Sequence, residues 1–449
     1  MTQGTVYIVH AVDTEGPLYE SIESKFERLG ELFDLSGVKA NIGNLEKLSK
    51  GEIDLGSATK DLQEVLKTHK NSTLGTWTEL NEMLEEVTSE EYRLSHPDSF
   101  GDGWVFNWFC MDHVGYQSNP RKRDMGYHNI HDRYVALVED QDWSNDTISF
   151  HFHPVSTYRE AHRCGTHYFR TDDFYQTLCR RLIDRNFFPS SYRAGFQAER
   201  PDIHWFLEQF IPYDISNMAC ENTSDIDACI DFKNGRSGNW RNAPNDWSVY
   251  HPDHDDYQKP GNCRRLIGRA LNINTRIGNI TQEEMDKAFD RASQGKDTLL
   301  GLCSHDWRDL TLEVSKIFEM LECCKKKFPE INYKFSQTNE AFKTQLLDAQ
   351  KKQSKLKLKI VFHEEERGVD VDFIEIKTLE GKVFGPQPYL AIKTKSQRYI
   401  HDNLDFGSSG DIWYYAFHHD TLPLSDVSEV VVAANDINGN TEIVRLKFE

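Results

Sequence analysis

Two histidines separated by one residue close a buried-looking run of the sequence, TISFHFHPVS at residues 147–156. On a strand, residues i and i+2 face the same side, so His151 and His153 project together while Phe152 faces the opposite layer. Two neutral imidazoles side by side are the beginning of a metal site. Ordinary hydrogen bonding of both rings is the alternative, because this spacing is common and supplies only two ligands.

A pair of carboxylates with the same spacing follows the first predicted strand, in the sequence VYIVHAVDTEGP. Asp13 and Glu15 share one side if the strand continues to Glu15. A carboxylate with two imidazoles is the minimum set for a divalent ion such as zinc with an open coordination position. Such an ion would activate water near neutral pH and polarise a carbonyl group. The alternative is that these acids, with Gly16, form the N-terminal cap of a helix.

Other predicted strands also end in ionisable residues: Asp112-His113 after the second, Arg193 in the fourth, and His305-Asp306 after the sixth. In parallel α/β folds the carboxyl ends of the strands meet on one rim. Arg193 would hold a carboxylate or stabilise negative charge, and a histidine across the site would protonate a departing amine. The residue types therefore indicate a metal-assisted amide hydrolase. A structural ion pair for Arg193 and a helix cap at His305-Asp306 are the alternatives.

Strand and helix patterns that could position these residues alternate over residues 5–345. The strand candidates are apolar on both faces, as in a parallel sheet covered by helices, which predicts an α/β barrel or a doubly wound sheet. The predicted strands are 6–13, 104–112, 147–153, 190–196, 213–217, 298–305 and 331–337. The predicted helices include 172–186, 200–211, 281–294 and 311–328.

The pattern changes near residue 350. From Lys355 onward short strands follow one another with turn signals and no helices, which predicts an all-β sandwich of immunoglobulin type. A chain of 449 residues is too long for one ordinary core, so we expect two domains, at 1–350 and 355–449. The segment at 18–103 is far longer than a usual connection and predicts a cap or an interaction surface.

Composition excludes several classes of function. The net charge of -20 argues against a nucleic-acid partner and against an anionic membrane surface. No window approaches the length of apolar sequence that a membrane span needs, and the first residues enter a strand pattern directly. The nine cysteines are scattered without a Cys-x-x-Cys pair, which favours reduced thiols and a cytoplasmic protein.

The chain resembles the polysaccharide deacetylase superfamily, also called NodB-type or carbohydrate esterase family four, as a divergent member. AVDTEGP stands where the family has Thr-Phe-Asp-Asp-Gly, HFHPVS resembles its histidine motif, and YRAGF resembles its Arg-x-Pro strand end. NAPNDW at 242–247 is similar to the family's Asp–Trp loop, and LCSH to its Leu-x-His strand end. The resemblance implies a distorted (β/α)7 barrel over residues 5–345. The sequence departs from the family in lacking the histidine four residues after the first and in replacing Asp-Asp with Asp-Thr-Glu.

By this resemblance, the metal ligands are Glu15, His151 and His153, and the catalytic base is Asp13. The reverse assignment of the two acids stays open. The resemblance also implies that Arg193 orients the base.

The remaining site residues come from the same comparison. His305 is implied as the general acid. Asp112, His113, Asp246 and Trp247 are expected to contact the substrate, although Asp112 or His113 could instead complete the metal coordination. An aromatic residue such as Trp247 in a loop is as often a packing anchor as a platform for a sugar.

The resemblance implies a cytoplasmic, zinc-dependent enzyme that removes an N-acyl group, typically acetyl, from an amino sugar or its nucleotide- or lipid-linked form. Such an enzyme would act in bacterial surface-polysaccharide biosynthesis, on O-antigen or capsule. The sandwich would pack on the barrel, bind glycan or form an oligomer contact. Two alternatives are hydrolysis of a non-sugar amide or cyclic imide, and a degenerate barrel that binds glycan without metal or catalysis.

Overall fold

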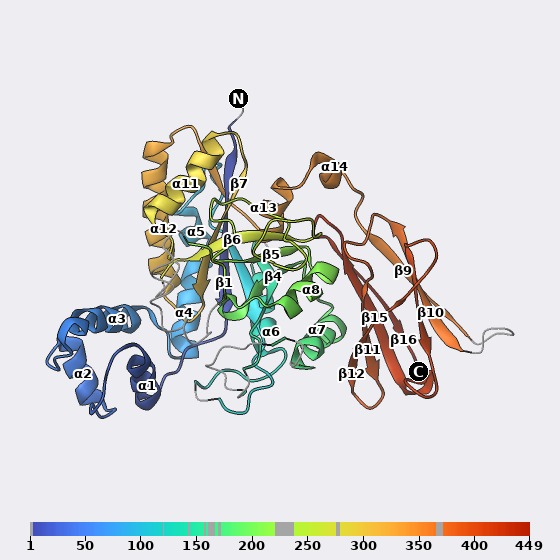
Figure 1. Ribbon diagram of the computed structural model, residues 1–449, viewed down its shortest axis with the longest axis horizontal. Coiled ribbons are helices and arrows are strands. Elements are labelled where there is room, and N and C mark those ends of the chain that lie inside the picture. The colour runs from blue at the N-terminus through green and yellow to red at the C-terminus, as the bar shows by residue number, and fades with distance from the viewer. Residues whose placement is uncertain are drawn as a thin grey trace.

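The first part of the chain folds into a closed barrel of seven parallel strands (Figure 1). The computed structural model describes residues 3–119, 121–141, 144–156, 159, 167–168, 172–220, 238–274, 279–364 and 371–449. The barrel strands are β1 (Thr5–Thr14), β2 (Phe106–Met111), β3 (Thr147–Phe152), β4 (Ser191–Ala194), β5 (Tyr213–Asn217), β6 (Leu266–Asn272) and β7 (Thr298–His305). Strand β7 pairs back with β1 and closes the ring. The α/β class and the barrel agree with the sequence prediction.

An eighth parallel strand, β8 (Asn332–Phe335), adds to the amino-terminal half of β1, whereas β2 pairs with its carboxyl-terminal half. The run at 331–337, predicted as a strand of the main sheet, is this eighth strand. The seventh strand of the ring is instead β6, which the apolar pattern of the sequence did not predict. Arg265 precedes β6 and Arg269 lies within it, and both are fully buried in ion pairs. Because of these two charged residues, the sequence of β6 looks polar although the strand is buried.

Helices cover the outside of the barrel and begin where the sequence supplies caps. The hydroxyl of Thr281 accepts the backbone N–H of Glu284 at the start of α11, and the carboxylate of Asp309 accepts that of Thr311 at the start of α12. The covering helices are α6 (Asn129–Glu139), α7 (Asp172–Arg185), α8 (Pro201–Phe210), α11 (Gln282–Ser293), α12 (Leu310–Lys327) and α13 (Thr338–Thr344). The one-turn helices η2 (Gly195–Gln197) and α14 (Asp348–Lys351) follow β4 and α13.

The long segment between β1 and β2 is helical and has two parts. Its elements are α1 (Ile22–Leu32), α2 (Ile42–Lys50), η1 (Gly56–Ala58), α3 (Thr59–Ser72), α4 (Trp77–Val87) and α5 (Glu90–Leu94). Helices α1 to α3 form a small core of their own and project from one side of the barrel (Figure 1). Helix α4 instead packs Leu80, Leu84 and Val87 into the main core. Only the first part therefore stands apart as a separate surface.

The carboxyl-terminal part contains two four-stranded antiparallel sheets packed over a shared apolar core. The sheet β13-β14-β10-β9 contains β9 (Lys357–His363), β10 (Asp372–Glu380), β13 (Asp405–Phe406) and β14 (Ile412–Phe417). The sheet β12-β11-β15-β16 contains β11 (Tyr389–Thr394), β12 (Tyr399–Asp402), β15 (Val427–Asn435) and β16 (Thr441–Lys447). A short helix, η3 (Leu424–Asp426), precedes β15. The all-β part predicted from the sequence is thus present as two packed sheets.

The sandwich is joined to the barrel by a continuous core. Tyr389 and Val431 of the sandwich belong to the same buried cluster as side chains of α7 and α8. The side-chain amide of Asn435 donates to the carbonyl oxygens of Pro189 at 2.8 Å and Phe210 at 2.9 Å. Buried apolar contact and side-chain-to-backbone hydrogen bonds of this kind hold the two parts together as one packed structure.

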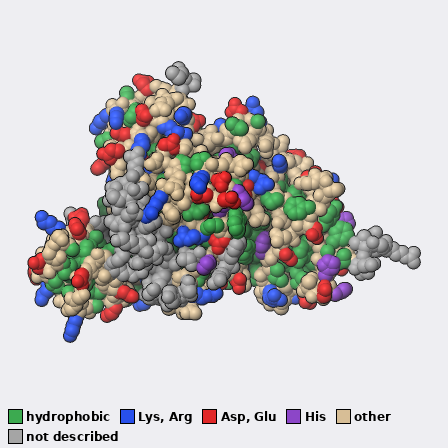
Figure 2. All heavy atoms as spheres, in the orientation of Figure 1, with side chains coloured by type: hydrophobic (Ala, Val, Ile, Leu, Met, Phe, Trp, Pro, Cys, Tyr) green, Lys and Arg blue, Asp and Glu red, His purple; other side chains and the backbone are tan. Residues whose placement is uncertain are grey.

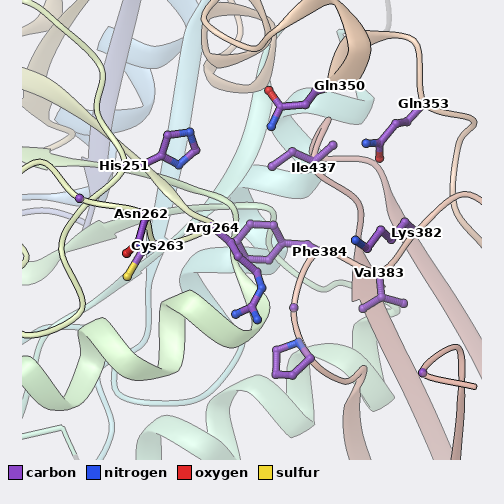
Figure 3. A pocket seen from close by; sticks show the side chains of 14 residues that line it. His251, Asn262, Cys263, Arg264, Gln350, Gln353, Lys382, Val383, Phe384 and Ile437 are labelled. Carbon is purple, nitrogen blue, oxygen red and sulfur yellow. The ribbon is translucent and has the colours of Figure 1, made fainter. Parts of the chain in front are cut away.

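A pocket of about 670 Å³ lies where the barrel meets the sandwich (Figure 3). Its lining comes from residues 261–264, from Gln350 and Gln353 at α14, and from the sandwich segment 382–386. The segment 261–264 leads directly into β6, so the pocket lies toward the amino-terminal end of that strand. The predicted site residues Asp13, Glu15, His151, His153 and His305 lie at the opposite, carboxyl-terminal ends of the strands.

Candidate metal centre

Three buried side chains from the carboxyl ends of β1 and β3 converge at one end of the barrel. Glu15, His151 and His153 each offer one ligand atom, and these atoms lie within 4.8 Å of one another. Nε2 of His151 is 2.9 Å from Nε2 of His153, and Oε1 of Glu15 is 3.4 Å from Nε2 of His153. This group could hold a metal ion.

The donor set and its spacing suit a divalent ion of the size of zinc. With bonds of about 2.0–2.1 Å, the ligand atoms of a tetrahedral site lie about 3.3 Å apart. The distance of 3.4 Å from His153 to Glu15 meets this requirement, and the distance of 2.9 Å between the imidazoles is a few tenths of an ångström short of it. Two imidazoles and one carboxylate leave a fourth position open, as catalytic zinc sites do and structural sites do not.

The ring of His151 is held in the form that binds metal. Its Nδ1 lies 3.0 Å from the backbone oxygen of Arg193. A carbonyl oxygen only accepts, so Nδ1 carries the proton and Nε2 presents its lone pair to the site. Burial and the neighbouring ring of His153 hold the pKa of His151 well below its ordinary value. The imidazole is therefore neutral near pH 7.

Glu15 is fixed by partners on both sides of the turn that follows β1. The carboxylate of Asp306 accepts the backbone N–H groups of Glu15 at 2.9 Å and Gly16 at 2.7 Å, and it also accepts the hydroxyl of Tyr134 at 2.8 Å. A terminal nitrogen of Arg123 lies 2.8 Å from Oε2 of Glu15. Burial raises the pKa of Glu15, but the guanidinium of Arg123 and the nearby imidazoles outweigh it and hold that pKa well below the usual value.

Asp13 lies one inward-facing position earlier on β1 and is paired with an arginine. Nε of Arg193 donates to both carboxylate oxygens, at 2.8 and 3.1 Å. A terminal nitrogen of Arg193 donates to the backbone oxygen of Ile215 at 2.9 Å. Oδ1 of Asp13 is also 3.7 Å from Nδ1 of His151. Asp13 thus lies beside the ligand group without belonging to it, and Arg193 holds its carboxylate in one orientation.

His153 is packed against the turn that follows β4. Its ring centroid lies 4.3 Å from that of Phe196, whose φ of 54° is in the left-handed region. Non-glycine residues in that region carry backbone strain of about 1–3 kcal/mol, and such strain is concentrated at functional sites. A Cβ at Gly195 would lie 2.2 Å from Cδ2 of His153 and 2.6 Å from its Cα. The absence of a side chain at position 195 is what allows His153 to occupy its place.

Alanine at position 195 is expected to weaken metal binding by at least about tenfold, because the new Cβ overlaps the backbone of His153 as well as its ring. Zinc affinity, measured by competition with a chromophoric chelator, checks this expectation. Gly30→Ala is the matched control, since a Cβ there meets no atom within 4 Å. Equal zinc affinity in Gly195→Ala and the wild type would contradict the placement of His153.

Two further histidines, His305 and His113, lie beside the ligand group. Nε2 of His305 is 4.0 Å from Oε1 of Glu15, and its ring packs on Trp307 with centroids 4.7 Å apart. Burial lowers the pKa of His305 to about 4. His113 is buried, and burial together with the charge of Arg123 lowers its pKa to about 3. Both imidazoles are neutral near pH 7.

Asp112 was predicted to contact substrate, but the structure places it in an ion pair between the barrel and the covering helix α7. One oxygen of Asp112 accepts a hydrogen bond from Arg181 of α7 at 2.8 Å. Because successive residues alternate sides, Asp112 faces the helix layer when its neighbour His113 faces the site. Burial raises the pKa of Asp112 to about 7 despite the nearby guanidinium.

Of the other two predicted substrate contacts, Trp247 is buried between β6 and α11, whereas Asp246 is exposed. The indole N–H of Trp247 donates to the backbone oxygen of Glu284 at 2.9 Å, and the guanidinium of Arg269 lies 4.4 Å from its ring centre. Asp246 accepts the backbone N–H of Ser248 at 3.1 Å. Trp247 is therefore a packing anchor and Asp246 stabilises a turn, because the apolar core takes up the indole.

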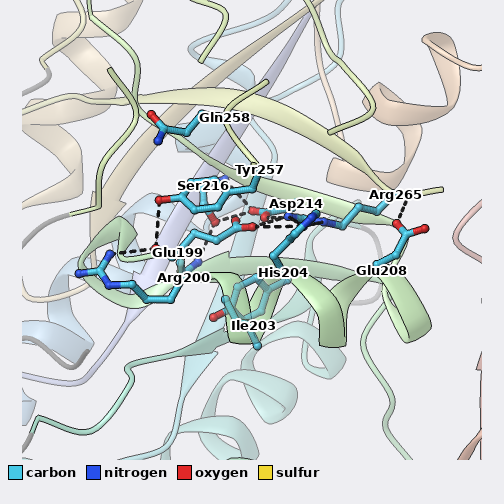
Figure 4. Close-up of polar contacts among 12 residues, drawn as sticks. Glu199, Arg200, Ile203, His204, Glu208, Asp214, Ser216, Tyr257, Gln258 and Arg265 are labelled. Atoms are coloured by element: carbon cyan, nitrogen blue, oxygen red, sulfur yellow. Dashed lines mark hydrogen bonds and ion pairs between the residues drawn. The ribbon is translucent and has the colours of Figure 1, made fainter. Parts of the chain in front are cut away.

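A second buried cluster supports β4 and β5 (Figure 4). Arg265 forms ion pairs with Glu199 and with Asp214, the latter at 2.7 Å. Asp214 accepts the hydroxyl of Ser216, whose oxygen in turn accepts the backbone N–H of the residue after Arg193 at 2.8 Å. Burial raises the pKa of Glu199 well above its ordinary value. This cluster shares no residue with the ligand group, and its bonds fix the end of the strand that carries Arg193.

Acidic and basic side chains are interspersed over the face of the molecule in Figure 2, with no extended basic area among its coloured atoms. In the part of the chain that the structure describes, no helix is both long enough and apolar enough to cross a bilayer. The described cysteines are all free thiols.

No protein family model, no curated protein and no solved structure matches this chain. The geometry of the site and the sequence motifs therefore carry the information on function.

Proposed function

We propose that this protein is a metal-dependent N-deacetylase, a divergent NodB-type barrel with an immunoglobulin-like sandwich. The observation that carries the proposal is the meeting of Glu15, His151 and His153 at one point, with the Asp13–Arg193 ion pair directly beside them. A ligand set with an open position and a separate, fixed carboxylate are the two parts that metal-assisted amide hydrolysis needs.

Zinc is the proposed ion. When bound, it would polarise the acyl carbonyl and lower the pKa of a water molecule toward neutrality. The carboxylate of Asp13 would take the proton from the attacking water. Arg193 holds that carboxylate in one orientation through the contacts at 2.8 and 3.1 Å. The imidazole of His305, which is neutral near pH 7, would take up the proton that Asp13 accepts from the water and would pass it to the departing amine.

The proposed substrate is an N-acetylated amino sugar, free or linked to a nucleotide or lipid, and the proposed setting is cytoplasmic synthesis of a bacterial surface polysaccharide. Support comes from the order of the motifs at Asp13, His151, Arg193 and His305, which resembles that of the polysaccharide deacetylases. The loop of the family's fourth motif does not add support, because Trp247 is in the core.

Metal analysis combined with an acetate assay tests the proposal. The purified protein, loaded with zinc and dialysed, is expected to retain about one ion per chain. It should release acetate from a panel of free and nucleotide-linked N-acetyl amino sugars, lose that activity with a chelator and regain it with added zinc. A chain that binds no divalent ion under metal-replete conditions, or whose activity ignores the chelator, would overturn the proposal. Ring opening of a cyclic imide to its dicarboxylic acid monoamide, without sugar deacetylation, would reassign the substrate.

A further inference from the structure

The two carboxylate oxygens of Glu15 face different partners. Oε1 lies 3.4 Å from Nε2 of His153 and 4.0 Å from Nε2 of His305, so it faces the ligand group. Oε2 lies 2.8 Å from a terminal nitrogen of Arg123. Both side chains of this ion pair are almost completely buried, at 9% and 4% exposure. The contact is therefore shielded from water and from salt, unlike a surface ion pair.

Arg123 also holds the backbone that carries Glu15. Its other terminal nitrogen donates to the carbonyl oxygens of Glu15 at 3.2 Å and Gly16 at 2.8 Å. The side chain of Asn119 accepts the backbone N–H of Arg123 at 2.7 Å and donates to its carbonyl at 2.6 Å. A planar guanidinium can span two carbonyls and a carboxylate at once, which the single ammonium of lysine cannot do with the same geometry.

We infer that Arg123 is a positioning residue that restricts Glu15 to binding the metal through Oε1 alone. The inference rests on the proposed function and extends it to a residue outside the predicted motifs. With Oε2 engaged by the guanidinium, the carboxylate supplies one ligand atom, and coordination positions stay open for substrate and solvent. The positive charge of Arg123 also offsets the charge of Glu15, which preserves the Lewis acidity of the site at some cost in metal affinity.

This role makes a different prediction from simple structural support. If Arg123 only held Glu15 in place, its removal would weaken metal binding. If Arg123 restrains the carboxylate, its removal frees Oε2 to become a second ligand atom and removes a positive charge from beside a cation. Metal binding then stays as tight or becomes tighter, while turnover falls.

Arg123→Met and Arg123→Lys test the inference with zinc and cobalt as probes. We expect the zinc dissociation constant of Arg123→Met to be unchanged or lower, and acetate release to fall by about 10- to 100-fold. The visible absorption of the cobalt-loaded variant should change toward a higher coordination number. Arg123→Lys keeps the positive charge but not the planar guanidinium. Its acetate release and cobalt spectrum should be intermediate between those of Arg123→Met and the wild type. Arg269→Lys is the matched control, because it alters an equally buried arginine whose partner is Glu284.

Zinc affinity that falls more than about tenfold in both Arg123 variants, with an unchanged cobalt spectrum, would overturn the inference and leave Arg123 as a support. Unchanged affinity, spectrum and turnover would overturn it as well. Failure of the proposed function is distinguishable, because the wild-type protein itself would then bind no zinc in the same titration or release no acetate in the same assay.

Discussion

Alanine at position 151 is expected to remove both the metal and the activity. His151 supplies one of three ligand atoms, and its ring is already oriented by the backbone oxygen of Arg193 at 3.0 Å. Changes in residues that only orient a ligand lower metal affinity or activity by about 10- to 100-fold, so loss of a ligand itself should exceed about 100-fold. Metal content after dialysis and the rate of acetate release measure the two effects.

His254→Ala is the control for this variant, because that side chain is exposed and the described contact of residue 254 with His204 is made through its backbone oxygen. Its metal content and activity should equal those of the wild type. A His151→Ala protein that keeps stoichiometric zinc and full turnover would show that the three-residue group is not the metal site.

Asparagine at position 13 is expected to lower kcat by about 10²- to 10⁴-fold, the usual contribution of a general base, while zinc stays bound. The amide cannot take a proton from water, yet it keeps nearly the same shape beside Arg193. Glu15→Gln should instead lose zinc, because Glu15 is a ligand and not the base. Parallel measurement of metal content and kcat in these two variants assigns the base and the ligand.

The reverse pattern, in which Asp13→Asn loses zinc and Glu15→Gln retains it, would exchange the two roles. Asp112→Asn is the matched control, since Asp112 is also a buried carboxylate beside an arginine but faces α7. It should lower stability through a weakened ion pair and leave the kcat of the folded protein unchanged. A loss of kcat as large as that of Asp13→Asn would show that Asp112 takes part in the reaction after all.

The local sequence pattern was sufficient for the barrel strands other than β6 and for the helices α7, α8, α11 and α12. The predicted strands at 213–217 and 298–305 coincide with β5 and β7, and the predicted helix at 281–294 differs from α11 by one residue at each end. Apolar runs and amphipathic periodicity report burial directly, so these elements are visible in the chain. Strand β6 was not predicted because Arg269 can be buried only through its ion pair with Glu284, which belongs to α11.

In the site too, the sequence determines some features and the tertiary structure determines others. Asp13 with Glu15, and His151 with His153, share a face because alternation is a property of the strand backbone, and the sequence alone determined this. Only the tertiary structure decided that Glu15 meets the histidines while Asp13 meets Arg193. It also brought Arg123, 107 to 108 residues away in the chain, to the turn at Glu15 and Gly16.

Asp306, which accepts the backbone N–H groups of that turn, lies still further away, at 290 to 291 residues. The sequence alone determines only which residues share a face, because backbone periodicity sets the direction of a side chain relative to its own strand. The order and register of the strands set the distances between side chains on different strands. Burial then requires each charged group to find its partner there, whatever the separation in sequence.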